Sequence, residues 1–122
     1  MSAPTGSRKL SAALREMVAA HLSAEGFEGV SATTPYTRLS EGIDTIGVPD
    51  IVGVPDTWLD VPARGSHRLS ADLDSAKSDA LSAGYPRAVV VAHRPGRPTA
   101  ESYAVMTLSD FAALARAATA NA

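Results

Sequence analysis

Residues 48–62 read Val-Pro-Asp-Ile-Val-Gly-Val-Pro-Asp-Thr-Trp-Leu-Asp-Val-Pro, and this stretch decides the fold that the sequence predicts. It contains two runs rich in β-forming residues, Asp50–Val54 and Thr57–Val61. Between them stands Pro55-Asp56, a pair typical of the turn in a hairpin. The stretch therefore predicts two adjacent antiparallel strands.

Upstream of this hairpin the sequence predicts a helix and a short strand. Ser7 can cap a helix that runs from Arg8 to about Glu25, and Gly26 can end it. The apolar residues of this segment recur at the steps of an amphipathic helix: Leu10, Leu14, Met17, Val18 and Leu22. Phe27 followed by Val30–Thr34 predicts a first strand, and residues 36–47 predict a loop or an irregular hairpin.

Downstream of the hairpin the sequence predicts a second helix and a central strand. Ser70 opens a helical stretch to about Ala83, which Gly84 closes. We expect one side of this helix to carry its apolar residues, which are Leu69, Leu73, Ala76, Ala80 and Leu81. The continuous apolar run Ala88–Ala92 predicts a strand buried on both faces.

The last third of the chain predicts a loop, a strand and a helix. Two prolines and a glycine exclude both a helix and a hydrogen-bonded β-strand for Arg94–Pro98. Tyr103–Thr107 then predicts a strand, and Ser109 is the expected cap of a final helix that carries Phe111, Leu114 and Ala118.

These elements together predict an α/β fold with a single mixed sheet flanked by helices, in the order α-β-β-β-α-β-β-α. We expect residues 1–7 to form a flexible tail, residues 8–118 the domain and residues 119–122 a frayed C-terminus.

Composition limits the classes of function. The 122 residues, 45% hydrophobic and 20% charged, suit one globular domain, and a net charge of −2 argues against general coating of nucleic acid. Cysteine is absent, and His21, His67 and His93 lack zinc-type spacing. Because no long apolar run or apolar leader stands in the sequence, we expect a soluble, intracellular protein without membrane attachment.

Three aspartates suggest metal-dependent chemistry. Asp44 lies in the predicted loop, Asp50 begins one strand of the hairpin and Asp60 stands near the end of the other. Antiparallel neighbours bring such carboxylates together, and converging carboxylates suit Mg²⁺ or Mn²⁺, which can activate a water for phosphodiester hydrolysis. The alternative is that all three are solvated turn residues beside glycine and proline.

The spacing and the element order resemble the PD-(D/E)XK, or restriction-endonuclease-like, nuclease superfamily. The resemblance places Asp50 on the first Asp of the motif and Asp60, ten residues later, on its (D/E), and it covers nearly the whole chain. Within the superfamily the chain looks most like small phage and archaeal Holliday-junction resolvases, because Arg8-Lys9-Leu10-Ser11 and Gly26-Phe27 precede the motif as they do there.

Two departures from the family pattern predict an impaired catalytic site. The family's catalytic lysine follows the (D/E) by two residues, where this chain has Pro62. Proline cannot orient a water or stabilise negative charge in the transition state. The position of the family's helix glutamate is Leu14 when counted from Arg8-Lys9 and Arg15 when counted back from Gly26-Phe27. Glu16 is close to both but lies on another side of the helix.

Another cation could replace the missing lysine. Lys77 lies on the helix after the motif, where some members of the superfamily carry theirs, and Arg64 lies just beyond Pro62. The plainer interpretations are an exposed helix lysine between Asp74 and Asp79 and a solvated loop arginine.

Contacts with nucleic acid would fall to basic residues of the N-terminus and the loops. The candidates are Arg8, Lys9, Arg64, His67, Arg68, Arg94 and Arg97. A solvated loop is the alternative for the densest group, Arg94-Pro95-Gly96-Arg97. Trp58 is expected to pack in the core rather than to stack on a base.

The resemblance implies a phage or prophage protein of the resolvase type, weakly active or inactive, that binds branched or duplex DNA, with homodimers as in the family. Such a protein would be located in the host cytoplasm or in the virion. A second hypothesis keeps the nuclease fold only as a scaffold, in a minor capsid or head-tail protein that contacts other virion proteins. A third is a small interaction domain without a nucleic-acid role.

Overall fold

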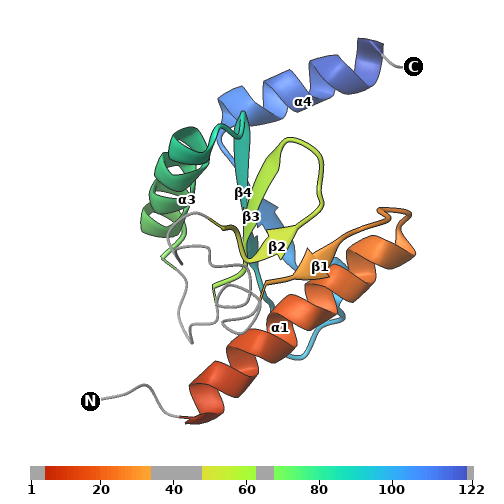
Figure 1. The fold of residues 1–122 in the computed structure, drawn as a ribbon, viewed down its shortest axis with the longest axis vertical. Helices are drawn as coiled ribbons and strands as arrows, with labels where there is room; N and C mark the ends of the chain where they lie inside the picture. The colour runs from red at the N-terminus through yellow and green to blue at the C-terminus, as the bar shows by residue number, and fades with distance from the viewer. Residues whose placement is uncertain (1–4, 34–47, 63–67, 121–122) are drawn as a thin grey trace.

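The computed structural model describes residues 5–33, 48–62 and 68–120 (Figure 1). Its helices and strands follow the predicted order, with one added 3-10 turn. They are α1 (Thr5–Ala24), β1 (Ser31–Ala32), β2 (Ile51–Val52), β3 (Thr57–Asp60), α3 (Leu69–Ala83), β4 (Arg87–Ala92), η1 (Thr99–Glu101), β5 (Tyr103–Val105) and α4 (Leu108–Ala120).

The strands form one mixed sheet in the order β1-β2-β3-β4-β5. The first three strands are an antiparallel meander, β4 runs parallel to β3, and β5 returns antiparallel to β4. The predicted α/β class with a single mixed sheet is therefore confirmed.

The β2–β3 hairpin has the turn that its sequence predicts. Asp56 adopts a positive φ of 57°, which aspartate tolerates better than most residues, and the Thr57 hydroxyl donates to the Pro55 carbonyl at 2.9 Å. Gly53 has a φ of 97°, and a Cβ built there would lie 2.3 Å from the Gly29 carbonyl oxygen. The hairpin therefore approaches the segment before β1 so closely that only glycine fits.

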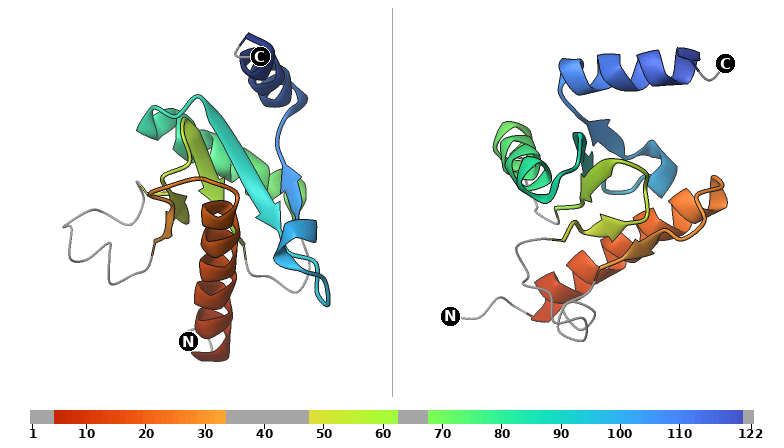
Figure 2. Two further views of the ribbon diagram at one scale, coloured as in Figure 1. Left: turned by 90° about the vertical axis from the view of Figure 1, so that its right-hand side faces the viewer. Right: turned by 45° about the horizontal axis from the view of Figure 1, so that its top comes forward.

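Two helices cover the two faces of the sheet (Figure 2). On one face, α1 packs against the sheet in a cluster of Leu14, Val18, Ala19, Ile51, Leu59, Val61, Val89 and Val91. On the other face, α3 packs through Ala76 and Ala80 against Trp58, Ala88 and Val90. Because β4 contributes to both clusters, it is buried on both faces as its apolar run predicts.

Two residues of the predicted apolar side of α3 are exposed. Ala76 and Ala80 are buried, but Leu69 at the start of the helix is 37% exposed and Leu81 is 82% exposed. Consecutive helical residues differ by about 100° in direction, so Leu81 cannot share the face of Ala80. Gly84 ends α3 with a left-handed φ of 83°, as predicted.

The predicted helix starts also need correction. Helix α1 begins at Thr5, so Ser7 lies within the helix and does not cap it. At the last helix the Asp110 backbone N–H donates to the Thr107 hydroxyl at 3.1 Å. Thr107 therefore caps α4 in place of Ser109, because α4 begins one residue before that serine.

Helix α4 extends away from the sheet (Figure 1). Its Leu108 and Phe111 are 80% and 53% exposed, and Leu114 is exposed as well. Asp110 is the buried residue of this helix. Among the described helices, α4 included, none has the length and apolar character needed to cross a membrane.

The approach of Gly53 to Gly29 gives a test of the hairpin position. We expect Gly53→Ala to lower the free energy of unfolding by about 3 kcal/mol, because a left-handed backbone strain adds to a clash with backbone atoms. Gly96→Ala is the matched control, since Gly96 also has a positive φ but has open space around a built Cβ. Denaturant unfolding of both variants measures the difference, and equal losses would contradict the close approach.

Candidate functional site

Asp50 and Asp60 face each other at the open end of the β2–β3 hairpin. Ile51 pairs with Leu59, so one residue further along each strand Asp50 stands opposite Asp60. The Asp50 backbone N–H donates to Asp60 Oδ1 at 3.2 Å, and the Val61 backbone N–H donates to Asp50 Oδ2 at 2.9 Å. The hairpin thus brings together the two aspartates that the motif singles out.

Trp58 holds the second oxygen of Asp60. Its indole Nε1–H donates to Asp60 Oδ2 at 3.0 Å, while its ring is 2% exposed and meets Tyr85 edge to face at 5.6 Å between centroids. The predicted core role of Trp58 is confirmed, but the polar contact was not predicted. The alternation of a strand contained the signal, because residues 58 and 60 share a face.

Arg15 brings a positive charge to Asp50 from α1. Its Nη1 lies 3.9 Å from Asp50 Oδ1 and donates to the Thr33 carbonyl at 3.1 Å, while Nε donates to the Ser11 carbonyl at 3.3 Å. The Arg15 side chain is only 16% exposed. Sequence analysis did not predict this contact, although Arg15 shares the apolar stripe of α1 with Val18 and Leu22, and a cation in such a stripe signals a partner.

The environment of the Asp60 carboxylate favours its neutral form. Burial, followed by the negative charge of Asp50, raises the pKa of Asp60 from 3.8 to about 6, although the hydrogen bonds from Trp58 and from the Asp50 N–H act in the opposite direction. Asp60 therefore carries much of its charge only above weakly acidic pH.

The described residues do not fit a divalent ion at this pair. Three of the four carboxylate oxygens accept an N–H hydrogen bond, and the fourth faces the Arg15 guanidinium. Across residues 5–33, 48–62 and 68–120, no group of three His, Cys, Asp or Glu side chains is arranged to hold a metal. Asp44, predicted as the third ligand, lies outside the described residues.

Lys77, the predicted substitute for the motif lysine, contacts a different carboxylate. Its Nζ lies 2.8 Å from Asp110 Oδ2, and the Ala88 backbone N–H donates to the same oxygen at 3.4 Å. Burial favours the neutral form of Asp110, but the Lys77 hydrogen bond and then the Ala88 N–H outweigh it and hold the pKa of Asp110 below its usual value. The ion pair joins α3 to the start of α4 and leaves the Asp50–Asp60 pair without Lys77.

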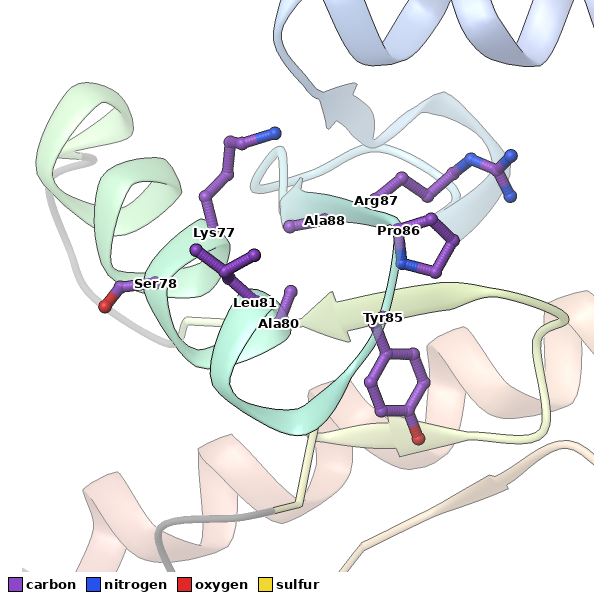
Figure 3. Close-up of a pocket in the computed structure, with 8 residues that line it drawn as sticks. All are labelled: Lys77, Ser78, Ala80, Leu81, Tyr85, Pro86, Arg87 and Ala88. Atoms are coloured by element: carbon purple, nitrogen blue, oxygen red, sulfur yellow. The ribbon is translucent and has the colours of Figure 1, made fainter.

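A pocket of about 340 Å³ lies beside this ion pair, where α3 ends and β4 begins (Figure 3). It is lined by Lys77, Ser78, Ala80, Leu81, Tyr85, Pro86, Arg87 and Ala88. Neither Asp50 nor Asp60 lines it. The pocket and the acidic pair are therefore separate features of the molecule.

The structure places some of the predicted DNA-contacting residues at one end of the sheet. Because β3 and β4 are parallel, the chain leaves both strands at the same end of the sheet. Asp60 is the last residue of β3 at this end, Arg68 precedes α3, and the β4–η1 loop follows β4. In that loop Arg97 pairs with Glu101 at 3.2 Å, and the Arg94 guanidinium lies 4.6 Å from the centre of the Tyr103 ring. Arg8 and Lys9 lie in the first turns of α1, while Arg64 and His67 fall outside the described residues.

Compared with protein-family models, with curated proteins and with solved structures, the chain matches none of them.

The raised pKa of Asp60 predicts how stability changes with pH. A folded-state pKa of about 6 against an ordinary 3.8 favours folding while Asp60 is protonated, so its contribution is complete below about pH 4 and is lost as pH rises through about 6. Relative to wild type, Asp60→Asn should therefore gain on the order of 2 kcal/mol between pH 4 and pH 7. Urea unfolding across this pH range measures the difference.

Asp56→Asn is the matched control for this pH series, because it makes the same exchange at an exposed turn residue. A constant difference in unfolding free energy between Asp60→Asn and wild type from pH 4 to pH 7 would contradict the environment described for Asp60.

Proposed function

We propose that the protein is a PD-(D/E)XK nuclease-like protein of the Holliday-junction-resolvase type, encoded by a phage or prophage, that binds DNA and has impaired or lost nuclease activity. The observation that carries the proposal is the pairing of Asp50 with Asp60 across a hairpin, while Lys77 is bound to Asp110 and not to the pair. The order of the elements supports it, since the hairpin is followed by a helix, a buried strand, a further strand and a helix, as the resemblance implies.

The missing chemistry is the stabilisation of charge. Hydrolysis of a phosphodiester builds negative charge on the phosphorus oxygens and needs a positioned donor or cation near the attacking water. Pro62 offers no such group, and the ammonium of Lys77 is bound to Asp110. Arg15 contacts Asp50, and two of its five N–H groups donate to the Ser11 and Thr33 carbonyls. The site therefore keeps acidic residues of the motif without its catalyst.

The DNA-binding part of the proposal rests on the end of the sheet where β3 and β4 finish. Arg68 is exposed there, and Arg94 and Arg97 belong to the adjoining loop. Arginine is suited to phosphate contacts, and a polar loop on a rigid sheet is a common position for them. The Tyr103 ring and the Glu101 carbonyl hold the Arg94 side chain in place, which lowers the entropy lost on binding. Arg97 pairs with the Glu101 carboxylate, an exposed ion pair that a phosphate would displace at low cost.

The second candidate function is a structural one, as a minor capsid or head-tail protein. Helix α4 favours it, because Leu108, Phe111 and Leu114 form an exposed apolar stripe on a helix that projects from the sheet. Such a stripe is typical of a surface that contacts other proteins. Detection of the protein by mass spectrometry in purified virions, together with no DNA binding in solution, would favour this candidate.

Cleavage assays test the catalytic part of the proposal. We expect no cleavage of a four-way junction or a linear duplex in Mg²⁺ or Mn²⁺ by wild type, because Pro62 stands where the motif has its lysine and loss of one transition-state donor costs about a hundred- to a thousandfold in rate. Pro62→Lys and Lys77→Ala are assayed beside wild type with the same DNA and metal. Robust wild-type cleavage that Lys77→Ala abolishes would contradict the proposal and identify Lys77 as a relocated catalyst. Cleavage by Pro62→Lys alone would show a metal site that lacks only its lysine.

Fluorescence anisotropy with labelled junction and duplex DNA tests the binding part. We expect the double variant Arg94→Ala/Arg97→Ala to bind about tenfold more weakly and with a shallower salt dependence, because phosphate contacts release counterions. Arg116→Ala is the matched control, since Arg116 is an exposed arginine on α4. Equal affinities of the double variant, the control and wild type would exclude the loop as a DNA contact.

A further inference from the structure

We propose that Arg15 is the built-in counter-cation of the Asp50–Asp60 pair, and that the pair joins α1, β1 and the β2–β3 hairpin structurally and does not bind a divalent ion. The inference deepens the proposed function. It rests on that function in one respect only, which is that Asp50 and Asp60 are taken as the acidic pair of the motif. It assigns to Arg15 a positioning role that the resemblance does not provide.

The first support is the state of each carboxylate oxygen. Asp60 Oδ1 accepts from the Asp50 N–H at 3.2 Å, and Asp60 Oδ2 accepts from the Trp58 indole at 3.0 Å. Asp50 Oδ2 accepts from the Val61 N–H at 2.9 Å, and Asp50 Oδ1 lies 3.9 Å from Arg15 Nη1. Each oxygen thus faces a donor of the protein, whereas a metal site presents several oxygens toward one common point.

The second support is that Arg15 is anchored independently of the Asp50 carboxylate. Its Nε and Nη1 donate to the carbonyls of Ser11 and Thr33. Thr33 is itself fixed to the start of β2, because its N–H donates to the Asp50 carbonyl at 2.8 Å and its hydroxyl donates to the Pro49 carbonyl at 2.7 Å. The guanidinium is therefore held beside Asp50 from two elements, and its direction is set before any ligand arrives.

The third support is electrostatic. An arginine stays protonated at any pH at which the protein folds, so its charge is permanent. A divalent cation bound to Asp50 Oδ1 would lie close to that charge in a site that is largely shielded from water, where like charges repel strongly. Arg15 already supplies a neutralising charge to Asp50, the first member of the acidic pair, and it also ties α1 to the sheet.

Metal binding and stability measured together test this role. We expect Mn²⁺, followed by electron paramagnetic resonance, not to bind wild type at millimolar concentration, and Mg²⁺ not to move its Tm. Arg15→Gln should lower the metal-free Tm by several degrees, because two carboxylates lose their counter-charge, and Mn²⁺ should restore much of the loss. Arg15→Lys keeps the charge and is the matched control, with no metal response.

Binding of Mn²⁺ by wild type that Asp50→Asn abolishes would overturn the proposal, and this measurement needs no folded Arg15 variant. Arg15→Gln with an unchanged Tm and no gained Mn²⁺ binding would overturn it as well. A double-mutant cycle gives a further measure: we expect Arg15→Gln and Asp50→Asn to be non-additive in unfolding free energy, and additivity would contradict the contact.

The anisotropy assay separates this inference from the proposed function. If wild type binds no DNA in any assay, the proposed function is wrong, and the metal titrations still decide the role of Arg15. If wild type binds both DNA and Mn²⁺, the proposed function is supported and the proposed role of Arg15 is wrong.

Discussion

The register of β2 against β3 is the constraint on which the rest of the structure depends. With Ile51 opposite Leu59, both side chains enter the cluster under α1, while Trp58 and Asp60 turn to the face that α3 covers. A slip of one residue would move Leu59 away from α1 and drive Asp60 into an aliphatic cluster, at the large cost of burying a carboxylate among apolar groups. Apolar packing therefore fixes the register, and the register alone brings the two aspartates together.

The polar network at the hairpin end follows from that register. Once Asp50 and Asp60 are opposite, each can accept an N–H from the other strand, and the two hydrogen bonds close the open end of the hairpin. The Trp58 indole needs an acceptor because its ring is buried, and Asp60 on the same face supplies it. Burial of Asp60 is thereby compensated by donors, but only in part, since its pKa remains raised.

Local pattern predicted most of the fold, and long-range contacts set part of what it missed. Alternating and apolar runs with turn residues predicted the hairpin, the buried strand β4 and the Gly84 helix end, because each depends on neighbours in sequence. The length of β1, which spans Ser31–Ala32 where the sequence predicts Val30–Thr34, depends on how elements meet. The Thr107 cap and the exposure of Leu81 are local in sequence, and the prediction assigned them wrongly. Asp50 and Asp60 were predicted to converge, whereas the contact of Arg15 with Asp50 joins residues 35 positions apart through the packing of α1.

The presence of both aspartates does not by itself indicate catalysis. Within the described residues, Asp50 closes the hairpin and receives Arg15, and Asp60 satisfies a buried indole. Each contact gives its carboxylate a structural use that needs no substrate. A motif that is recognised by spacing depends only on residue types. Metal binding also requires that the carboxylate oxygens point toward one common position. In this chain three of the four carboxylate oxygens accept a protein N–H and the fourth lies 3.9 Å from Arg15, so the same two residues that suggest a nuclease also serve the packing of a scaffold.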